Sequence, residues 1–336
     1  MKVLLYFGNI DKIKKSGIGR ALKHQMAALE SQGIEYTLDP KDDFDIAHLN
    51  TYWPDAKKLF KKLKKKGVPV IMHGHSTIED FKNSFRFWPL IAKIWYNKNL
   101  YWFYKRADLI ITPTNYSKQC IDNYNLGTEV IAISNGINPQ EYAYNQEYID
   151  AFKQKFNLKD DDKVVIGVGF PFNRKGIKDF IEIGRQFPDM KFFWFGHLAK
   201  ILTEHNVLKA IKNRPENVIM PGYIDGHIIK GAYHFAKAFM FTSYEETEGI
   251  VVLEALASKC PVLIRDIGVY ADWMEDGKTC LKAQNNEGFA ENLRKVLSSD
   301  NTEMIETGYK ISEQRTIEEI GRDLKAAYEK VLNKNK

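Results

Sequence analysis

The chain has 336 residues, of which 44% are hydrophobic and 27% are charged, and its formal net charge is +6. A chain of this length exceeds one ordinary core and suits two domains, and its composition excludes a mostly disordered protein. The net charge is modest, so its placement along the chain matters more than its sum.

The amino-terminal segment has an apolar run of only a few residues, which ends before Gly8 and Asn9. A run this short predicts a first β-strand and not a signal peptide. No later stretch reaches the roughly 18 uncharged apolar residues that a membrane-spanning helix needs. The three cysteines lack metal-ligand spacing, which indicates reduced thiols. We therefore expect a cytoplasmic protein that is soluble or attached to a membrane surface.

The first half of the chain repeats one pattern: a short apolar run, a loop and an amphipathic helix. The spacing of Leu22, Met26 and Leu29 predicts a helix over residues 19–31. Strands that alternate with helices predict a parallel, doubly wound sheet of the α/β class. The predicted strands of this half are residues 3–7, 45–49, 68–72, 109–112 and 129–133.

Positive charge and aromatic side chains gather in this half. Seven lysines lie between Lys57 and Lys66, with apolar residues at helical spacing among them. From Phe81 to Arg106, aromatic residues alternate with lysine and arginine. Apolar surface and positive charge together suit an anionic membrane, where each basic residue contributes about 1 kcal/mol. The alternative is a solvated lysine face beside ordinary core aromatics.

The second half starts the same pattern again at Lys163, with a helix near residues 177–187. Its predicted strands are residues 164–170, 192–195, 218–220, 238–242 and 261–264. Residues 138–162 lack a strand pattern, so we place a hinge near Asn138. The expected organisation is one α/β lobe over 1–137, a second over 138–315, and a helix within 316–336 that could pack across either lobe.

The most informative stretch is SYEETEGIVVLEALA, residues 243–257, in which seven residues separate Glu246 from Glu254. Glu254 lies about one turn into a predicted helix and could accept hydrogen bonds from ribose hydroxyls. Glu246 lies in the preceding loop and could accept them from sugar hydroxyls. For two such carboxylates alone, a solvated glutamate and a capping acid are the alternative.

Between these carboxylates, Gly249 is expected to open the helix. A glycine at this place lets the backbone approach a ligand. The backbone amides of Gly249, Ile250 and Val251, together with the helix dipole, would form an anion site. We expect a diphosphate to bind there.

Three further motifs accompany this stretch: SGIG at residues 16–19, SNGI at 134–137 and NRKG at 173–176. Together, and in this order, the motifs resemble those of the family-4 retaining glycosyltransferases of GT-B architecture. The resemblance implies two Rossmann-like lobes that face each other across a cleft, with the acceptor held mainly by the first and the nucleotide sugar by the second. It also implies that no metal is needed, because basic side chains and helix amides neutralise the leaving diphosphate.

Within this resemblance, Arg174 and Lys175 match the basic residues that neutralise the diphosphate. Such cations would stabilise the charge that grows on the leaving group. The family pattern places an arginine five positions before the lysine, but this sequence has Phe170 there. We therefore assign the arginine role to Arg174. A charged turn between a strand and a helix is the alternative for this motif.

Two residues of the first half complete the predicted site. Gly17, in the SGIG loop, is expected to contact the donor phosphates, although such a loop alone is a weak signal. His75 follows a predicted strand at the position where the family carries a histidine that reaches the donor sugar. A purely structural histidine is the alternative for His75.

Metal binding and covalent catalysis are not expected. His73 and His75 form an HxH pair, but no third ligand follows at a useful spacing. The acidic residues between Asp42 and Asp45 are better explained as a solvated turn. By the resemblance, the acceptor attacks the sugar from the face that the diphosphate leaves, and Glu246 holds the sugar instead of attacking its anomeric carbon.

The acceptor is suggested by a closer resemblance. KSGIGRALKHQMAAL near the start, HGHSTIEDFKNSF from His73, and residues 243–258 are similar to bacterial enzymes that add the second hexose to glucosyl-diacylglycerol. This implies a UDP-sugar donor, with galactose slightly preferred over glucose, and a glycolipid anchor of lipoteichoic acid as the product. It also implies a peripheral location on the inner face of the cell membrane and no role for nucleic acid.

Two other functions stay open at this point. One is a glycosyltransferase of the same fold with a capsule, teichoic-acid or other soluble acceptor, which failure to sediment with anionic liposomes would favour. The other is a catalytically silent nucleotide-sugar-binding or membrane scaffold protein, which would bind the donor without turnover.

Overall fold

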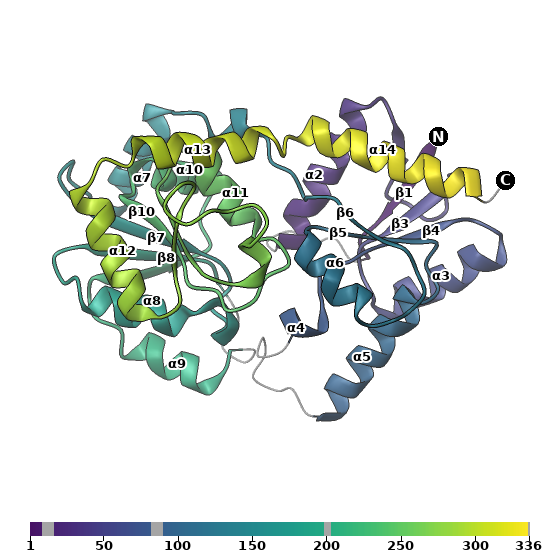
Figure 1. Ribbon diagram of the computed structural model, residues 1–336, viewed down its shortest axis with the longest axis horizontal. Coiled ribbons are helices and arrows are strands. Elements are labelled where there is room, and N and C mark those ends of the chain that lie inside the picture. The colour runs from purple at the N-terminus through teal and green to yellow at the C-terminus, as the bar shows by residue number, and fades with distance from the viewer. Residues whose placement is uncertain (9–16, 82–89, 198–202, 335–336) are drawn as a thin grey trace. The chain divides into compact units, whose positions relative to one another are not determined.

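The computed structural model describes residues 1–8, 17–81, 90–197 and 203–334 (Figure 1). The chain forms two compact units. Of the described residues, unit 1 contains 1–8, 17–81, 90–137 and 315–334, and unit 2 contains 138–197 and 203–314. Among the described residues, the chain leaves unit 1 after Ile137 and returns to it at Arg315. None of the described helices is long and apolar enough to cross a membrane.

Unit 1 is built on a parallel sheet of six strands in the order β2-β1-β3-β4-β5-β6. The strands are β1 (Lys2–Tyr6), β2 (Glu35–Thr37), β3 (Ile46–Leu49), β4 (Val70–His73), β5 (Leu109–Thr112) and β6 (Val130–Ala132). The helices are α2 (Gly17–Ser31), α3 (Pro54–Lys65), α4 (Ile78–Phe81), α5 (Leu90–Tyr104), α6 (Asn115–Asp122) and α14 (Ile317–Lys334).

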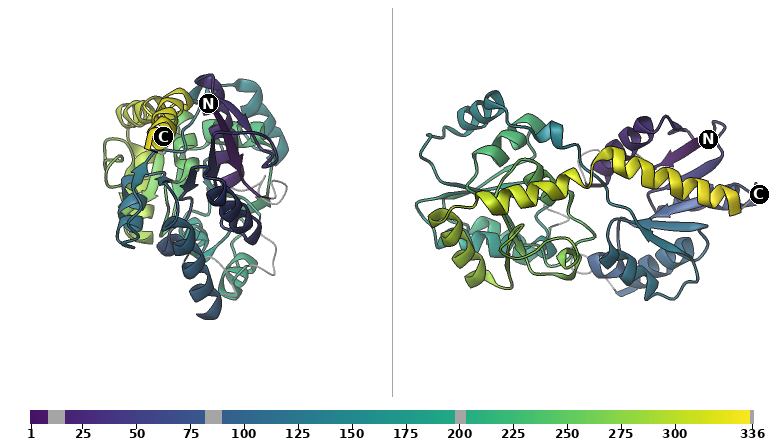
Figure 2. Two further views of the ribbon diagram at one scale, coloured as in Figure 1. Left: turned by 90° about the vertical axis from the view of Figure 1, so that its right-hand side faces the viewer. Right: turned by 45° about the horizontal axis from the view of Figure 1, so that its top comes forward.

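Alternate residues of the unit 1 strands supply two cores, one on each face of the sheet. Val3 and Leu5 of β1 join a core that α2 and α14 cover, whereas Leu4 joins a core that α3 and α5 cover. Helix α14 packs against α2, and Figure 2 shows this yellow helix beside the purple amino-terminal segment. The last helix of the chain therefore completes the core of the first unit.

Where the chain returns to unit 1, it runs beside the segment by which it left. Ile137 forms a parallel bridge with Thr316, with hydrogen bonds from Ile137 N to the Arg315 carbonyl at 2.9 Å and from Ile317 N to the Ile137 carbonyl at 3.1 Å. The two segments that join the units are therefore held together at this point.

Unit 2 repeats the architecture with a parallel sheet in the order β12-β11-β10-β7-β8-β9. Its strands are β7 (Val164–Val168), β8 (Lys191–Phe195), β9 (Val218–Gly222), β10 (Ala238–Phe241), β11 (Val262–Arg265) and β12 (Leu281–Ala283). Its helices are α7 (Gln146–Phe156), α8 (Ile177–Arg185), α9 (His205–Lys212), α10 (Gly226–Phe235), α11 (Ile250–Ala257), α12 (Asn286–Ser298) and α13 (Thr302–Glu313).

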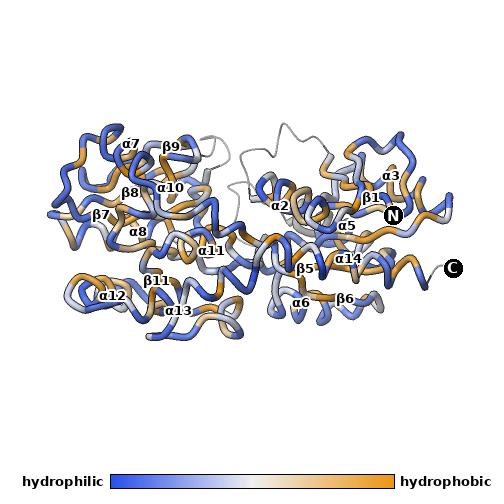
Figure 3. Tube along the Cα trace, turned by 90° about the horizontal axis from the view of Figure 1, so that it is seen from above, coloured by the Kyte–Doolittle hydropathy of each residue, from blue (hydrophilic) through white to orange (hydrophobic). Residues whose placement is uncertain are grey.

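Strands β7, β8, β10 and β11 of unit 2 are buried on both faces, as their almost continuous apolar runs predict for a parallel sheet. Helices α8 and α12 contribute to a core that contains Phe180 and Trp194. On another part of the sheet, Phe152 of α7 contacts the rings of Phe193 and Phe195. Figure 3 shows hydrophobic segments along strands such as β7 and hydrophilic segments at the outer loops.

Strand order locates a candidate binding edge in each unit. The order reverses between β1 and β3 in unit 1 and between β7 and β10 in unit 2. In open parallel sheets, ligands bind beyond the carboxyl ends of the strands at such a reversal. The loops that follow β1, β3, β7 and β10 are therefore the first places to look for a site.

The predicted fold class is confirmed, and each strand expected from an apolar run is present. Two edge strands, β2 and β12, were not predicted because each has only three residues and a polar or small composition. Helix α7 lies in the segment that was interpreted only as a hinge region without strands.

Candidate active site

A close backbone contact brings two predicted motifs together in unit 2. Gly176 has a φ of +72°, and a side-chain Cβ there would come within 2.1 Å of the Thr242 carbonyl oxygen. Only glycine allows this approach, which sets the loop after β7 against the end of β10. Tyr244 N also donates to the Arg174 carbonyl at 2.8 Å. The NRKG motif and the Glu-x7-Glu stretch therefore meet at the reversal of strand order.

At this contact, four side chains form what we call the ion cluster: Arg174, Lys175, Ser243 and Glu246. Lys175 Nζ is paired with Glu246 Oε1, and Arg174 Nη1 lies 3.6 Å from the same oxygen. Ser243 Oγ donates to Glu246 Oε1 at 2.5 Å. Arg174 and Glu246 are only 9% and 6% exposed. Three residues predicted to act together thus lie within direct contact of one another.

The electrostatics of the ion cluster follow from its burial. Burial alone would raise the pKa of Glu246, but the charges of Lys175 and Arg174 outweigh it, and the pKa is lowered. The carboxylate therefore stays ionised and accepts hydrogen bonds only. Two cations, Lys175 and Arg174, thus lie at one carboxylate oxygen of Glu246.

The helix predicted to begin at Gly249 is also present, as α11. Gly249 is the N-cap of α11 with a φ of +86°, and a Cβ there would lie 2.9 Å from the Tyr270 hydroxyl. Ile250 and Val251 are the first two residues of α11. The first amides of a helix have no partner inside the helix, so they point toward the space beyond its end. This geometry suits a phosphate group.

Glu254 lies deeper than its predicted role requires. Its side chain is fully buried, and its Oε2 accepts a hydrogen bond from the Tyr233 hydroxyl at 3.1 Å. The helical spacing did place it on the same helix as Gly249, one turn along. Its role as a ribose ligand stays a prediction.

The predicted residues of unit 1 lie at the corresponding edge of the other sheet. His75 follows β4, and its Nε2 lies 2.6 Å from Asn50 Oδ1 at the end of β3. The His75 ring stacks on His73 at a centroid distance of 4.0 Å and lies 6.4 Å from Phe7 at the end of β1. His75 is thus held at the reversal of strand order in unit 1.

Gly17 is the first residue of α2 and is exposed, and no atom would obstruct a Cβ at this position. The described structure therefore contains no steric reason for a glycine there. Ser16, the first residue of the SGIG motif, lies outside the described residues. A donor contact by Gly17 stays a prediction.

Metal binding has no support from side-chain grouping. Across residues 1–8, 17–81, 90–197 and 203–334, no three His, Cys, Asp or Glu side chains are grouped so that they could hold a metal ion. The HxH pair belongs instead to a neutral cluster, since burial lowers the pKa of His75 to about 3 and that of His73 well below its ordinary value.

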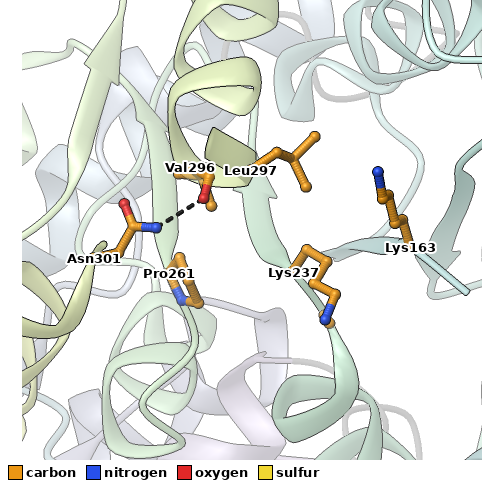
Figure 4. A pocket seen from close by; sticks show the side chains of 7 residues that line it. Lys163, Lys237, Pro261, Val296, Leu297 and Asn301 are labelled. Carbon is orange, nitrogen blue, oxygen red and sulfur yellow. Dashed lines mark hydrogen bonds between the residues drawn. The ribbon is translucent and has the colours of Figure 1, made fainter. Parts of the chain in front are cut away.

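Unit 2 also contains a cavity of about 300 Å³, which is not lined by any residue of the ion cluster. It is lined by residues that precede the strands, among them Lys163, Lys237 and Pro261, and by the Val296–Asn301 turn, where Asn301 Nδ2 donates to the Val296 carbonyl at 2.8 Å (Figure 4). The cavity is therefore at the amino-terminal ends of β7, β10 and β11. It contains none of the predicted site residues.

Sequence reasoning missed several residues of the two edges. Asn50 and Gln25 join His75 through hydrogen bonds, and Ser243 joins Glu246. Tyr270 lies against Gly249 and Tyr233 against Glu254. Asn50 could have been found, because it directly follows a predicted strand next to the reversal of strand order. The tyrosines come from distant segments and carry no local signal.

Comparisons with known proteins agree with this arrangement. Residues 24–141 match the family described as Glycosyltransferase Family 4, and residues 149–311 match the one described as Glycosyl transferases group 1. The chain is 54% identical, over 99% of both chains, to a processive diacylglycerol alpha-glucosyltransferase from Acholeplasma laidlawii. It is 26% identical to an alpha-galactosylglucosyldiacylglycerol synthase from Streptococcus pneumoniae, over 75% of this chain and 66% of the relative.

Solved structures share the fold at low identity. A sucrose-phosphate synthase from Thermosynechococcus elongatus superposes with a TM-score of 0.81 at 16% identity and covers 99% of both chains. The Anabaena protein HepE, solved with UDP and glucose, has a TM-score of 0.77 at 16% identity over 98% of this chain and all of HepE.

Proposed function

This chain belongs to the family-4 glycosyltransferases and is a hexosyltransferase with two Rossmann-like units. On this premise, we propose that it transfers glucose from UDP-glucose to a diacylglycerol glycolipid at an anionic membrane surface. The ion cluster of unit 2 is the observation that carries the proposal. Its cations, buried Arg174 and partly buried Lys175, suit the diphosphate of a nucleotide sugar, and its carboxylate suits sugar hydroxyls.

Lys175 and Arg174 act on the leaving group. As the bond between the sugar and the diphosphate breaks, negative charge grows on the diphosphate oxygen, and fixed cations in a buried site stabilise that charge without reorganising. An ammonium carries three N–H donors, so Lys175 can hold Glu246 and a phosphate oxygen together. The amides at the start of α11 would bind a second phosphate oxygen.

The transfer step needs no group beyond the two substrates. The acceptor hydroxyl oxygen forms a bond to the anomeric carbon on the face from which the diphosphate departs, and the bond from that carbon to the diphosphate oxygen breaks. The proton of the acceptor hydroxyl passes to the departing oxygen. The anomeric configuration of the sugar is therefore retained. We propose that the reaction is independent of metal ions.

The carboxylates bind hydroxyl groups in this scheme. Glu246, ionised and fixed by Ser243, would accept hydrogen bonds from the transferred sugar. Glu254 would accept them from the ribose once Tyr233 holds its carboxylate in place. Gly17 and His75 of unit 1 would contact the donor phosphates and the sugar.

The choice of glucose rests on the relative that is 54% identical, whose name is that of a diacylglycerol glucosyltransferase. The galactosyl relative is only 26% identical, so the preference for galactose that the sequence motifs suggest has less support than glucose. The product would be a hexosyl-diacylglycerol with one further sugar. Its use as an anchor of lipoteichoic acid stays a prediction.

The membrane surface would be the exposed face of α3. Its apolar residues, Leu59, Phe60 and Leu63, are buried in the unit 1 core, so this helix offers charge and no insertion face. Within α3, the exposed lysines without a described ion pair are Lys58, Lys61, Lys62 and Lys65. This revises the sequence interpretation, in which the same helix supplied apolar surface as well.

Beside α3, three basic side chains lie near the indole ring of Trp102. Lys57 Nζ lies 4.5 Å, Arg106 Cζ 4.9 Å and Lys61 Nζ 5.7 Å from the centroid of Trp102. Desolvation and then the charges of Lys61 and Arg106 lower the pKa of Lys57. Cations that repel one another in this way favour an anionic partner such as a phospholipid headgroup. Residues 82–89 of the aromatic segment Phe81–Arg106 lie outside the described residues, and most of its remainder is α5.

The activity is tested by offering UDP-glucose and UDP-galactose to the protein with glucosyl-diacylglycerol in mixed micelles. We expect a product one hexose heavier by mass, formed from UDP-glucose, with an α-linkage by NMR. Transfer from UDP-galactose alone would overturn the choice of donor. Transfer only to a soluble saccharide would favour the capsule or teichoic-acid alternative, and donor binding without turnover would favour a silent scaffold.

The membrane surface is tested by reversing Lys58, Lys61, Lys62 and Lys65 to Glu. Lys64 is left unchanged because its Nζ pairs with Asp108 at 2.7 Å, and Asp108 in turn accepts from Val70 N. Binding to anionic vesicles should be lost, since four charges near a membrane contribute about 4 kcal/mol, while transfer to a short-chain soluble glucoside should persist.

The matched control carries the same change of charge at exposed lysines of unit 2. They are Lys155, Lys159, Lys209 and Lys212. If this control loses vesicle binding as fully as the α3 variant, net charge and not the α3 surface would be responsible. If the α3 variant keeps full activity on glycolipid vesicles, the lysines are only a solvated face.

A further inference from the structure

An exposed aromatic side chain lies beside the ion cluster of unit 2. Tyr244 follows Ser243 in the loop after β10, and it is 50% exposed. Its backbone N donates to the Arg174 carbonyl at 2.8 Å. Tyr244 is therefore joined to the ion cluster both along the chain and by a hydrogen bond. We call Tyr244 and the two residues that hold its side chain, Arg265 and Asp179, the tyrosine platform.

A buried guanidinium covers one face of the Tyr244 ring. Arg265 Cζ lies 3.9 Å from the centroid of this ring and 5.5 Å from the centroid of Phe289. Phe289 belongs to the core to which α8 and α12 contribute. A cation over an aromatic face is attracted by the π electrons of the ring. Because Arg265 covers this face, the exposed surface of Tyr244 is the opposite face of the ring and its rim.

Arg265 is itself fixed by three segments of unit 2. It is 4% exposed. Its guanidinium donates to the Thr242 carbonyl at 3.1 Å, to the Gln284 carbonyl at 2.7 Å and to Asp179 Oδ2 at 3.2 Å. These partners directly follow β10 and β12 or lie in the first turn of α8. The N–H donors of a guanidinium lie in one rigid plane, so the three hydrogen bonds determine its orientation.

The hydroxyl end of the ring is held as well. Desolvation and then a hydrogen bond to the Asp179 carboxylate raise the pKa of Tyr244. A tyrosine side chain has only two torsions, so little freedom is left for it to lose when a ligand binds. The platform thus offers an exposed aromatic face that is already in a fixed position.

The platform and Glu254 lie toward opposite faces of the unit 2 sheet. Tyr233, which donates to Glu254, contacts Phe239 of β10 at a centroid distance of 5.6 Å. The next residue of that strand, Met240, belongs to the α8–α12 core. Successive strand residues face opposite sides of a sheet, so Glu254 lies on the other side from this core. If ribose binds at Glu254 and the diphosphate at the ion cluster, the sugar end of the donor and not its base is directed toward the platform.

The chemistry of the platform suits a pyranose ring. A pyranose has C–H groups on its faces and hydroxyls around its rim. The flat apolar face of a tyrosine removes such C–H groups from water. The ionised Glu246 carboxylate, two residues along the chain, can accept hydrogen bonds from the hydroxyls. A nucleobase also stacks on aromatic rings, so it is the alternative ligand that an experiment must separate.

From these contacts we propose that Tyr244 is a stacking platform for the pyranose ring of a substrate, and that Arg265 is the positioning residue that holds it. The glucose of the donor and the glucose of the glycolipid acceptor present the same chemistry to the ring. The inference rests on the proposed function for the identity of these substrates. It requires no contact from unit 1.

The first test removes the ring and measures binding to UDP, UDP-glucose and a short-chain soluble glucoside, by calorimetry for the nucleotides and by NMR titration for the glucoside. In Tyr244→Ala the Kd of UDP should stay within twofold of wild type. The Kd of UDP-glucose should rise about tenfold if the platform holds the donor sugar, and the Kd of the glucoside if it holds the acceptor sugar. A tenfold change corresponds to about 1.4 kcal/mol. Three unchanged constants would overturn the proposal.

The matched control is Tyr144→Ala. Tyr144 is a 70% exposed tyrosine of the same unit, and its ring centroid lies 5.8 Å from that of His234. His234 is in the last turn of α10, which leads into the amino-terminal end of β10. Tyr144 is therefore at the opposite edge of the sheet from the ion cluster, and the three constants should stay within twofold. An equal loss in both variants would show a general effect of removing an exposed ring and would overturn the proposal.

The same variant distinguishes a pyranose from other ligands. If Tyr244→Ala weakens UDP as much as UDP-glucose, the ring stacks on the base and the proposal is overturned. If it abolishes binding to anionic vesicles and leaves sugar binding unchanged, the ring contacts lipid, which also overturns it. Tyr244→Phe retains the aromatic face and should keep most of the sugar affinity that Tyr244→Ala loses. A Phe variant as weak as the Ala variant would show that the hydroxyl and not the face binds the ligand.

Arg265→Lys tests the positioning role. Lysine keeps the charge but lacks the plane that stacks on the ring and donates in three directions. We expect sugar binding to weaken about threefold, with no further loss when Arg265→Lys is added to Tyr244→Ala, because both changes act through the same ring. Losses that multiply in the double variant would show that Arg265 acts independently of Tyr244.

These readouts separate the two levels of inference. If the wild type transfers no sugar but Tyr244→Ala weakens the binding of UDP-glucose or the glucoside and not that of UDP, the platform is correct and the proposed function fails. If the wild type transfers glucose and Tyr244→Ala alters none of the three constants, this inference fails alone.

Discussion

The two units place different chemistry at the same position of the same architecture. In unit 1 the edge where strand order reverses holds a network of neutral side chains around His75, whereas in unit 2 it holds the ion cluster around Glu246. Desolvation lowers the pKa of His75 and keeps its ring neutral, whereas the charges of Lys175 and Arg174 keep Glu246 ionised. The difference lies in the presence of buried cations, not in the fold.

This comparison indicates a division of labour. A neutral network offers directional hydrogen bonds that suit hydroxyl groups, and a charged cluster offers a field that suits phosphate. The topology determines where each site is, and a few side chains determine what it binds.

The largest effect is expected from removing a cation of unit 2. Lys175→Ala should lower kcat by about 10²–10³-fold, the usual cost of losing one transition-state donor. The control Lys178→Ala removes a lysine three residues away that is not in the ion cluster, and should stay within twofold. Steady-state kinetics with UDP-glucose measure both, after melting curves confirm folding. Near-normal turnover in Lys175→Ala would remove the ion cluster from the reaction.

Acid should weaken unit 1 before unit 2. The folded-state pKa values of His48 and His75, about 3, lie below the ordinary value. As pH falls below about 6.5, the unfolded chain binds protons that folded unit 1 does not, so the free energy of unfolding falls. For His48, His73 and His75 together we expect a loss of about 2 kcal/mol between pH 7.5 and 6.0.

The ion cluster should behave differently in the same experiment. The pKa of Glu246 is lowered, so its contribution is lost only as pH falls below the ordinary value of about 4.3 for glutamate. Urea unfolding at the two pH values, with hydrogen exchange to locate the opening, measures both units. Glu246→Gln should not alter the step between pH 7.5 and 6.0. Equal weakening of the two units would contradict the comparison.

A smaller effect is expected from Tyr233→Phe. The variant removes the hydroxyl that donates to Glu254 Oε2 at 3.1 Å. A lost hydrogen bond to a buried carboxylate costs about 1 kcal/mol or somewhat more, which corresponds to a fivefold to tenfold higher KM for UDP-glucose. An unchanged KM in Tyr233→Phe would place Glu254 in a purely structural role.

Chelation is expected to have the smallest effect of all. If side chains and helix amides neutralise the diphosphate, transfer measured in EDTA should equal transfer measured without it. Added Mg²⁺ or Mn²⁺ should not raise the rate. A strict requirement for either metal would show that the positive charge of the ion cluster is insufficient.

Local patterns were enough to predict the sheets. Apolar runs such as 164–168 and 238–241 are buried on both faces and can only be central strands. The edge strand β2 has the sequence EYT and carries no such signal. Helix α3 shows the limit of a periodic pattern, which predicts that one face is apolar but not whether core or membrane covers it.

The candidate site was predictable where neighbouring residues carry it. The NRKG motif and the Glu-x7-Glu stretch were each visible alone, and the contact of Gly176 with Thr242 explains why they meet. Tyr328 was not predictable, because it lies 280 residues from His48 and reaches it only through the packing of α14 on unit 1. A sequence pattern does not encode such a pairing.

The return of the chain to unit 1 has a consequence for biosynthesis. Leu324, Tyr328 and Val331 of α14 belong to the core of the unit whose strands are made first. Between Ile137 and Arg315 the ribosome adds the 177 residues of 138–314 (314 − 138 + 1), which takes about 10–35 s at roughly 5–20 residues per second. During this time residues 138–314 can fold, while α2 covers its part of this unit 1 core and the part that α14 covers stays exposed. The nascent amino-terminal half is thus the part of the chain most in need of a chaperone.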